Sequence, residues 1–157
     1  MPDTDYAGMD AQLAALIGDE PDALASTANF VALLYNGIHD VNWLGVYVLR
    51  GDELVLGPFQ GNTACVRITL GDGVCGTAAA SGKTQLVEDV HTFPGHIVCD
   101  VASRSELVVP LEIDGKLVGV LDIDSPTLAR FGEDDRVGVE RLCRTFCDSR
   151  SGSARFI

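Results

Sequence analysis

Three cysteines in the middle of the chain, Cys65, Cys75 and Cys99, are the residues best suited to redox chemistry. A reactive cysteine needs a lowered thiolate pKa, access to solvent and often a second cysteine that resolves the oxidised product. Cys99 fits this description best, because it lies in a predicted long loop, close in sequence to His96 and to the positive charge of Arg104. The alternative is a half-buried loop thiol without chemistry, since buried cysteine is common as a small apolar residue.

Cys65 and Cys75 are the candidates to resolve an oxidised Cys99. Cys75 lies at the mouth of a predicted short helix, whose free N–H groups favour a thiolate. Cys65 begins a predicted strand. Either cysteine can pair with Cys99 if the fold brings their Cα atoms within about 7 Å. Core packing is the alternative for both, and we interpret the two remaining cysteines, Cys143 and Cys147, as core residues on the apolar face of the last helix.

Two carboxylates share one face of a predicted strand. Alternation places Asp122 and Asp124 on the same side as Val118 and Val120, while the residues between them point the other way. Such a pair lies at a solvated edge or offers a negative pocket to a cationic ligand, such as an amino group.

Glu106 would strengthen this pocket, because it enters the partner strand of the predicted hairpin. The Asp114-Gly115 pair is a strong two-residue turn signal and would pair residue 107 with residue 122. Strict alternation then sends Glu106 to the face opposite Asp122. Glu106 is therefore expected in the pocket only if the chain bends where the loop becomes a strand.

Two aromatic residues and one group of possible metal ligands are further candidates for a binding site. Trp43 and Tyr47 are four apart on a predicted strand, so they form either an apolar wall for a small ligand or part of the core. A metal site could be assembled from His91, His96 and Cys99, but the chain has no Cys-x-x-Cys or His-Glu-x-x-His spacing. We therefore predict no bound metal.

The elements that must position these residues alternate between helical and strand periodicity. Helical spacing and capping signals predict helices over residues 9–17, 21–36, 76–81 and 133–148. Period-two alternation predicts strands over residues 43–50, 53–59, 65–70, 85–89, 107–113 and 116–124. With the long loop over residues 90–105, this order predicts an α/β (α+β) sandwich built on one central antiparallel sheet. We divide the chain into an N-terminal helical extension (1–20), a main domain (21–148) and a flexible tail (149–157).

Composition narrows the classes of function. The 157 residues are 46% hydrophobic and carry a formal net charge of −12, which predicts one soluble domain with a real core. Without a basic stripe, this charge repels nucleic-acid phosphates and anionic lipids. The start of the chain lacks a secretion signal, and no apolar run is long enough to span a membrane. We expect a cytoplasmic protein, whose five cysteines are kept mainly reduced.

Seven segments resemble the free methionine-(R)-sulfoxide reductases, which are enzymes built on the GAF domain. The resemblance runs from about Leu24 to Cys147 and is carried by Asn42–Tyr47 (NWLGVY), Ala64–Ile68 (ACVRI), Gly73–Ala78 (GVCGTA), Glu88–His91 (EDVH), Gly95–Asp100 (GHIVCD), Ser105–Leu111 (SELVVPL) and Gly119–Ser125 (GVLDIDS). It implies a GAF fold over residues 21–148. Cys143 and Cys147 depart from the family pattern.

The resemblance implies roles for the matching cysteines. Cys99 would attack the sulfoxide sulfur and become a sulfenic acid, which Cys65 would resolve as a disulfide, with Cys75 as an auxiliary or alternative resolving thiol. Thioredoxin would restore the dithiol, and NADPH would enter only through thioredoxin reductase. No bound cofactor is implied, and a homodimer is plausible for the family.

The resemblance also implies roles for residues around the substrate. Glu106, Asp122 and Asp124 would bind the α-ammonium group, and one of them, kept protonated, would donate a proton to the sulfoxide oxygen. Trp43 and Tyr47 would enclose the thioether methyl group. Two rival functions are a non-catalytic GAF module that binds a small molecule, and a thiol peroxidase or redox sensor that uses Cys99 but ignores the amino-acid group.

Overall fold

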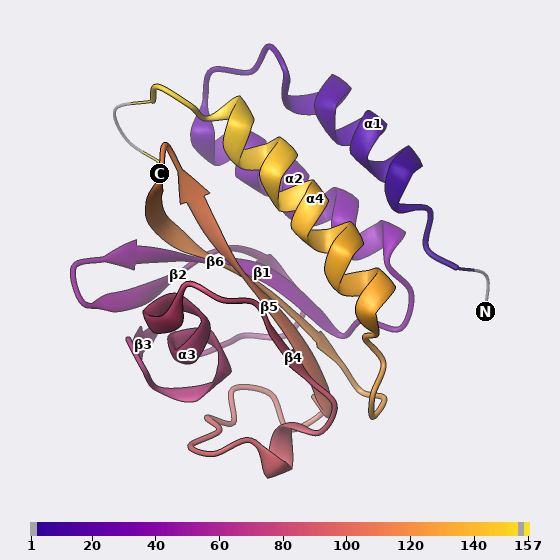
Figure 1. Cartoon of the computed structure of the whole chain (residues 1–157), viewed down its shortest axis with the longest axis vertical. Helices are drawn as coiled ribbons and strands as arrows, with labels where there is room; N and C mark the ends of the chain where they lie inside the picture. Colours follow the sequence, from indigo (N-terminus) through magenta and orange to yellow (C-terminus); the bar gives the residue numbers. More distant parts are fainter. Residues whose placement is uncertain (1–2, 154–155) are drawn as a thin grey trace.

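The chain, seen here in a computed structural model that describes residues 3–153 and 156–157, forms a six-stranded antiparallel sheet with helices on both faces (Figure 1). Residues 1–2 of the predicted extension and residues 154–155 of the predicted tail lie outside the described residues. The strand order is β3-β2-β1-β6-β5-β4, and every neighbouring pair is antiparallel. The predicted fold class is confirmed.

The four α-helices of the described chain are α1 (Tyr6–Ile17), α2 (Ala23–Gly37), α3 (Gly73–Ser81) and α4 (Glu133–Ser149). The carboxylates of Asp5 and Asp22 cap α1 and α2 by accepting hydrogen bonds from the first turn of each helix. Helix α2 buries only one of its faces. Leu24 is exposed, while Phe30 and Leu34 are fully buried.

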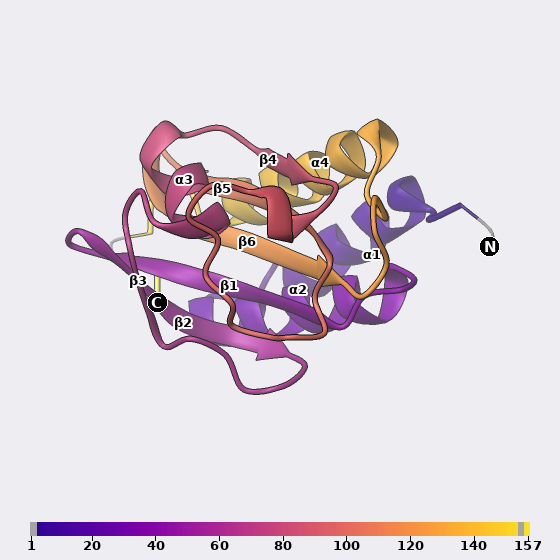
Figure 2. The same cartoon turned by 90° about the horizontal axis from the view of Figure 1, so that it is seen from below.

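The strands are β1 (Trp43–Arg50), β2 (Glu53–Gln60), β3 (Arg67–Thr69), β4 (Gln85–Val87), β5 (Ser105–Ile113) and β6 (Lys116–Ser125). The prediction that Cys65 begins a strand is wrong, because β3 starts two residues later and pairs with β2 only over three residues. Cys65 therefore lies in the loop between β2 and β3. Between β4 and β5, a short 3-10 turn (Val90–Thr92) leads into an irregular segment, residues 93–104. This segment, called the crossing loop below, crosses the sheet face in front of β1 and β6 (Figure 2).

A β-bulge in the β5–β6 hairpin sets the direction of the acidic side chains. Close to the turn, Ile113 pairs with Lys116, as a two-residue turn requires, but the register shifts at Leu111/Glu112. Beyond the shift, Glu106 pairs directly with Asp124. Because directly paired residues point to the same face, Glu106 joins the two aspartates. The expected condition, a bend where the loop becomes a strand, is thus replaced by a bulge near the turn.

The same bulge corrects the prediction for Val118. This residue lies between Leu117, which pairs with Glu112, and Gly119, which pairs with Leu111. Val118 packs with the helix-side core, whereas Val120 belongs to the cluster on the opposite face.

The larger hydrophobic core lies between the sheet and α1, α2 and α4. Phe30 and Phe146 stack at its centre with ring centroids 4.4 Å apart. The helix-side predictions for Cys143 and Cys147 are confirmed, since both are buried in this core. From the segment predicted as a flexible tail, Phe156 packs against Phe146 with centroids 5.9 Å apart. None of the helices among the described residues is long and apolar enough to cross a membrane.

Candidate active site

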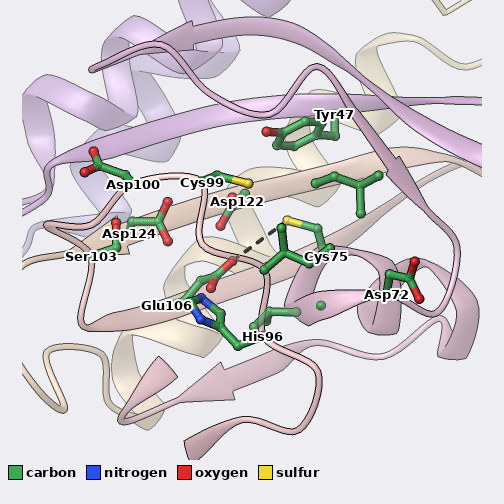
Figure 3. Close-up of a pocket in the computed structure, with 14 residues that line it drawn as sticks. Tyr47, Asp72, Cys75, His96, Cys99, Asp100, Ser103, Glu106, Asp122 and Asp124 are labelled. Carbon is green, nitrogen blue, oxygen red and sulfur yellow. Dashed lines mark hydrogen bonds between the residues drawn. The ribbon is translucent and has the colours of Figure 1, made fainter. Parts of the chain in front are cut away.

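A small pocket lies on the sheet face covered by α3 and by the segment between β4 and β5 (Figure 3). Its cavity volume is about 40 Å³. It is lined by side chains from β1, α3, the crossing loop, β5 and β6, among them Tyr47, Val74, Cys75, His96, Cys99, Asp100, Ser103, Glu106, Asp122 and Asp124. Residues from segments far apart in the sequence thus meet at one place.

Cys65 and Cys99 form a disulfide at the edge of this pocket. Their Cα atoms lie 5.4 Å apart, within the range that a disulfide requires. Both residues are half-buried. Of the two pairings that spacing left open, the structure has Cys65 with Cys99, while Cys75 is a free and buried thiol.

Cys75 sits at the base of the pocket, in the first turn of α3. Its thiol donates a hydrogen bond to Glu106 Oε1, with a sulfur–oxygen distance of 3.8 Å. Burial, followed by the charges of Asp122 and Glu106, raises the pKa of this thiol well above its ordinary value. The prediction that the helix N-terminus favours a Cys75 thiolate is therefore wrong, because burial beside carboxylates outweighs the weak helix dipole.

Glu106, Asp122 and Asp124 form a buried acidic cluster. Their exposed fractions are 6%, 6% and 9%. Burial is the largest cause that raises all three pKa values, taking the pKa of Asp122 to about 6, and the charge of Asp122 further raises the pKa values of Glu106 and Asp124. Such a cluster keeps at least one carboxyl protonated near neutral pH, because like charges in a dry site resist ionising together.

Trp43 and Tyr47 form the aromatic wall that their spacing allowed. The two rings stack with centroids 5.8 Å apart, and the Tyr47 hydroxyl donates a hydrogen bond to the carbonyl oxygen of Cys65. Trp43 donates through Nε1 to the carbonyl of Asn62. Both rings border a second small cavity together with Cys99 and Asp122. The wall therefore faces the disulfide and the acids.

A polar network that sequence reasoning missed holds the crossing loop. Asn42 Nδ2 donates to Asp100 Oδ2 (3.3 Å) and to Ser103 Oγ (3.2 Å), and Asp100 also accepts a hydrogen bond from the Ala102 amide. Asn42 is far from the loop in sequence, so no local motif connects them. In the sequence, Cys99 and the resemblance over Gly95–Asp100 marked this loop as functional, but neither indicates its contacts with Asn42.

Of the two basic residues expected near Cys99, His96 lies at the pocket and Arg104 does not. His96 lines the pocket, and burial, followed by the charge of His91, lowers its pKa. Arg104 is exposed and is not among the lining residues. Among the described residues, the possible metal ligands that come together are Cys75, Glu106 and Asp122, and not the set of His91, His96 and Cys99.

Comparisons with known proteins agree with this geometry. The GAF domain family matches residues 19–146. The chain is 52% identical to the free methionine-R-sulfoxide reductase of Escherichia coli over 137 residues, which cover 87% of this chain and 83% of that protein. It superposes on the structure of fRMsr of Staphylococcus aureus in complex with substrate with a TM-score of 0.90 and 45% identity, covering 95% and 97% of the two chains. The free methionine-R-sulfoxide reductase of Neisseria meningitidis, also with its substrate, gives a TM-score of 0.88 at 44% identity, covering 92% and 87%.

Proposed function

The chain belongs to the GAF domain family and, within it, to the free methionine-R-sulfoxide reductases, and we propose that it reduces free L-methionine-(R)-sulfoxide with Cys99 as the nucleophile. The observation that carries this function is the Cys65–Cys99 disulfide at the edge of a pocket with three buried acids. A small-molecule binding module needs neither the disulfide nor the acids in this arrangement.

The proposed reaction is balanced by the two cysteines of the disulfide. The Cys99 thiolate attacks the sulfoxide sulfur, the sulfoxide oxygen takes up a proton, and methionine leaves while the oxygen stays on Cys99 as a sulfenic acid. The Cys65 thiol then displaces this oxygen as water, and a Cys65–Cys99 disulfide forms. The sulfoxide gains two electrons and the dithiol loses two.

The acidic cluster supplies both charge and a proton in this proposal. Asp122, whose pKa of about 6 leaves it ionised near neutral pH, accepts the α-ammonium group of the substrate. Glu106 or Asp124, whose pKa values are raised well above their ordinary values, stays protonated and donates to the sulfoxide oxygen. This division explains a preference for the free amino acid, because a methionine residue inside a protein lacks the ammonium group.

Trp43 and Tyr47 enclose the thioether methyl group in this proposal, and Cys75 serves as an auxiliary thiol. Support comes from the position of the stacked rings beside Cys99 and Asp122. The substrate is thus held at its charged end by carboxylates and at its apolar end by aromatic rings.

Thioredoxin completes the proposed cycle by reducing the disulfide. Its reduction potential of about −270 mV is low enough for many catalytic disulfides, and both cysteines of this disulfide are half-buried rather than enclosed. NADPH then acts only through thioredoxin reductase, without a cofactor bound to this chain. A cytoplasmic location and a homodimer are further parts of the proposal, and they rest on the family resemblance.

The test is turnover of racemic free methionine sulfoxide by the purified protein with dithiothreitol, with the two epimers separated. We expect loss of the R epimer alone, and no loss of either epimer with Cys99→Ala. Cys143→Ala is the matched control, because it removes a thiol on the opposite side of the sheet. A folded, reduced wild type that converts neither epimer would refute the proposed function.

A further inference from the structure

One sulfur and two carboxylate oxygens converge inside the pocket. Cys75 Sγ, one oxygen of Glu106 and one oxygen of Asp122 all lie within 4.8 Å of one another, and all three residues are buried. They come from α3, β5 and β6, so three separate elements aim a ligand atom at one point (Figure 3). Thiolate and carboxylate groups are both zinc ligands in proteins.

A second observation is that one oxygen of this cluster lacks a hydrogen-bond partner. Asp122 Oδ1 is buried without a hydrogen-bond partner, although the residue is only 6% exposed. Among the described residues that line the pocket, none is a lysine or an arginine, so its carboxyl groups face no fixed cation. A buried, uncompensated carboxylate is costly unless a cation or a proton occupies the site.

The sulfur–oxygen distance between Cys75 and Glu106 suits a small tetrahedral cation. Zinc bonds of about 2.3 Å to sulfur and about 2.1 Å to oxygen, at a tetrahedral angle, place the two ligand atoms about 3.6 Å apart. Cys75 Sγ and Glu106 Oε1 are 3.8 Å apart. The sulfur ligand favours zinc and similar thiophilic cations over magnesium or calcium, which prefer all-oxygen sites.

We propose that Cys75, Glu106 and Asp122 bind one thiophilic divalent cation, such as Zn²⁺, and that this cation and the amino-acid substrate exclude each other. The exclusion rests on the proposed function, since the cation takes the Asp122 oxygen that the substrate ammonium would contact. The cavity of about 40 Å³ holds a cation and a water molecule as fourth ligand. On binding, the Cys75 thiol and, where it is protonated, the Glu106 carboxyl group release their protons to solvent, and no electrons are transferred.

The oxidised protein gives the clearest test of Zn²⁺ binding. With Cys65 and Cys99 in their disulfide, the free thiols are Cys75 on one side of the sheet and Cys143 and Cys147 on the other. Zn²⁺ binding is measured by competition with a chromogenic zinc chelator, and Co²⁺ replaces Zn²⁺ to reveal a thiolate-to-metal charge-transfer band. Neither readout needs turnover, so a failure of the proposed function leaves the cation site testable.

We expect one Zn²⁺ per chain, with affinity at least about 10-fold lower in Cys75→Ala and in Asp122→Asn, and unchanged in Cys143→Ala. The Co²⁺ band should be present in wild type and Cys143→Ala and absent in Cys75→Ala. Excess free methionine sulfoxide should weaken Zn²⁺ binding to reduced protein in which Cys99→Ala prevents turnover.

Several outcomes would overturn the proposal. One is a wild type that binds no Zn²⁺ at stoichiometric concentration, and another is a folded Cys75→Ala that binds it as tightly as wild type. Loss of binding in Cys143→Ala instead would place the site in the helix-side core. Simultaneous binding of Zn²⁺ and methionine sulfoxide, without mutual weakening, would refute the exclusion alone.

Discussion

Cysteines lie on both faces of the sheet, but their surroundings differ. On the α4 face, Cys143 and Cys147 lie among leucine and phenylalanine side chains, and burial raises the pKa of both thiols. On the α3 face, the disulfide lies beside three buried carboxyl groups. Cysteine is therefore a packing residue on one face, whereas on the other two cysteines form a disulfide beside an acidic pocket.

The difference also concerns stability. The apolar face gains from burial, at roughly 25 cal/mol for each Å² of apolar surface. The acidic face buries groups that would be more stable in water. We expect substitutions on the first face to affect folding and those on the second to affect chemistry.

The largest expected effect distinguishes a cysteine on the α3 face from one on the α4 face. Cys99→Ala should lower kcat for free methionine-(R)-sulfoxide by about 10⁴-fold or more, because no other thiol is placed to replace the nucleophile. Cys143→Ala should keep kcat within about 2-fold of wild type and cost about 1 kcal/mol of stability. Epimer-resolved kinetics and chemical denaturation measure the two quantities. Comparable loss of activity in both variants would abolish the distinction between the faces.

A large effect on the apolar face should spare the chemistry. Phe146→Ala removes a fully buried ring that contacts Phe30 and Phe156, and should cost about 3–5 kcal/mol of unfolding free energy. Urea denaturation gives this value, and kcat per folded molecule at low temperature should stay near wild type. A specific loss of kcat in the folded variant would show that the helix-side core shapes the site.

Removal of a single carboxyl group should separate a reductase from a redox sensor. Glu106→Gln should lower sulfoxide reduction by about 10²- to 10³-fold, because it removes a candidate proton donor. Oxidation of Cys99 by hydrogen peroxide offers no sulfoxide oxygen for Glu106 to protonate and should change little. Parallel assays of the two oxidants decide the question, and equal losses with both would favour the general thiol sensor.

A smaller effect should be a gain in folding stability, although most substitutions reduce it. At pH 8, Asp122→Asn should stabilise the fold, by up to about 3 kcal/mol, since burial raises the pKa of Asp122 from 3.8 to about 6. The acid binds its proton more tightly when folded, so its cost is absent well below pH 3.8, grows between pH 3.8 and about 6, and is complete above that range. Denaturation at pH 8 and pH 5 tests this, and a gain at pH 5 as large as at pH 8 would exclude the charge as the cause.

Alternation along a strand predicted the positions of Asp122 and Asp124, because a period of two fixes which side chains share a face. The same rule failed for Glu106 and Val118. A bulge at Leu111/Glu112 shifts the register by one residue, and the Asp114-Gly115 turn carries no information about it. Secondary structure was thus readable where it depended on local pattern, and misread where one extra residue changed the pairing.

Contacts between residues far apart in the sequence were harder to predict. Spacing left both Cys65 and Cys75 as partners for Cys99, and only the crossing of the long loop over the sheet separates them. The raised pKa of the Cys75 thiol was also not predictable, because it depends on burial and on carboxylates from β5 and β6 that no motif near Cys75 indicates. The resemblance to a known family, rather than the residues alone, favoured Cys65.

The central claim is that Cys65 and Cys99 together carry the two electrons of the reaction. Fully reduced protein mixed with one equivalent of free methionine-(R)-sulfoxide, denatured in an alkylating agent and mapped by mass spectrometry, tests it directly. We predict one methionine formed for each Cys65–Cys99 disulfide, with Cys75, Cys143 and Cys147 alkylated. Methionine formed while Cys65 and Cys99 remain alkylated, or a new disulfide between Cys99 and Cys75 in place of Cys65, would contradict the account.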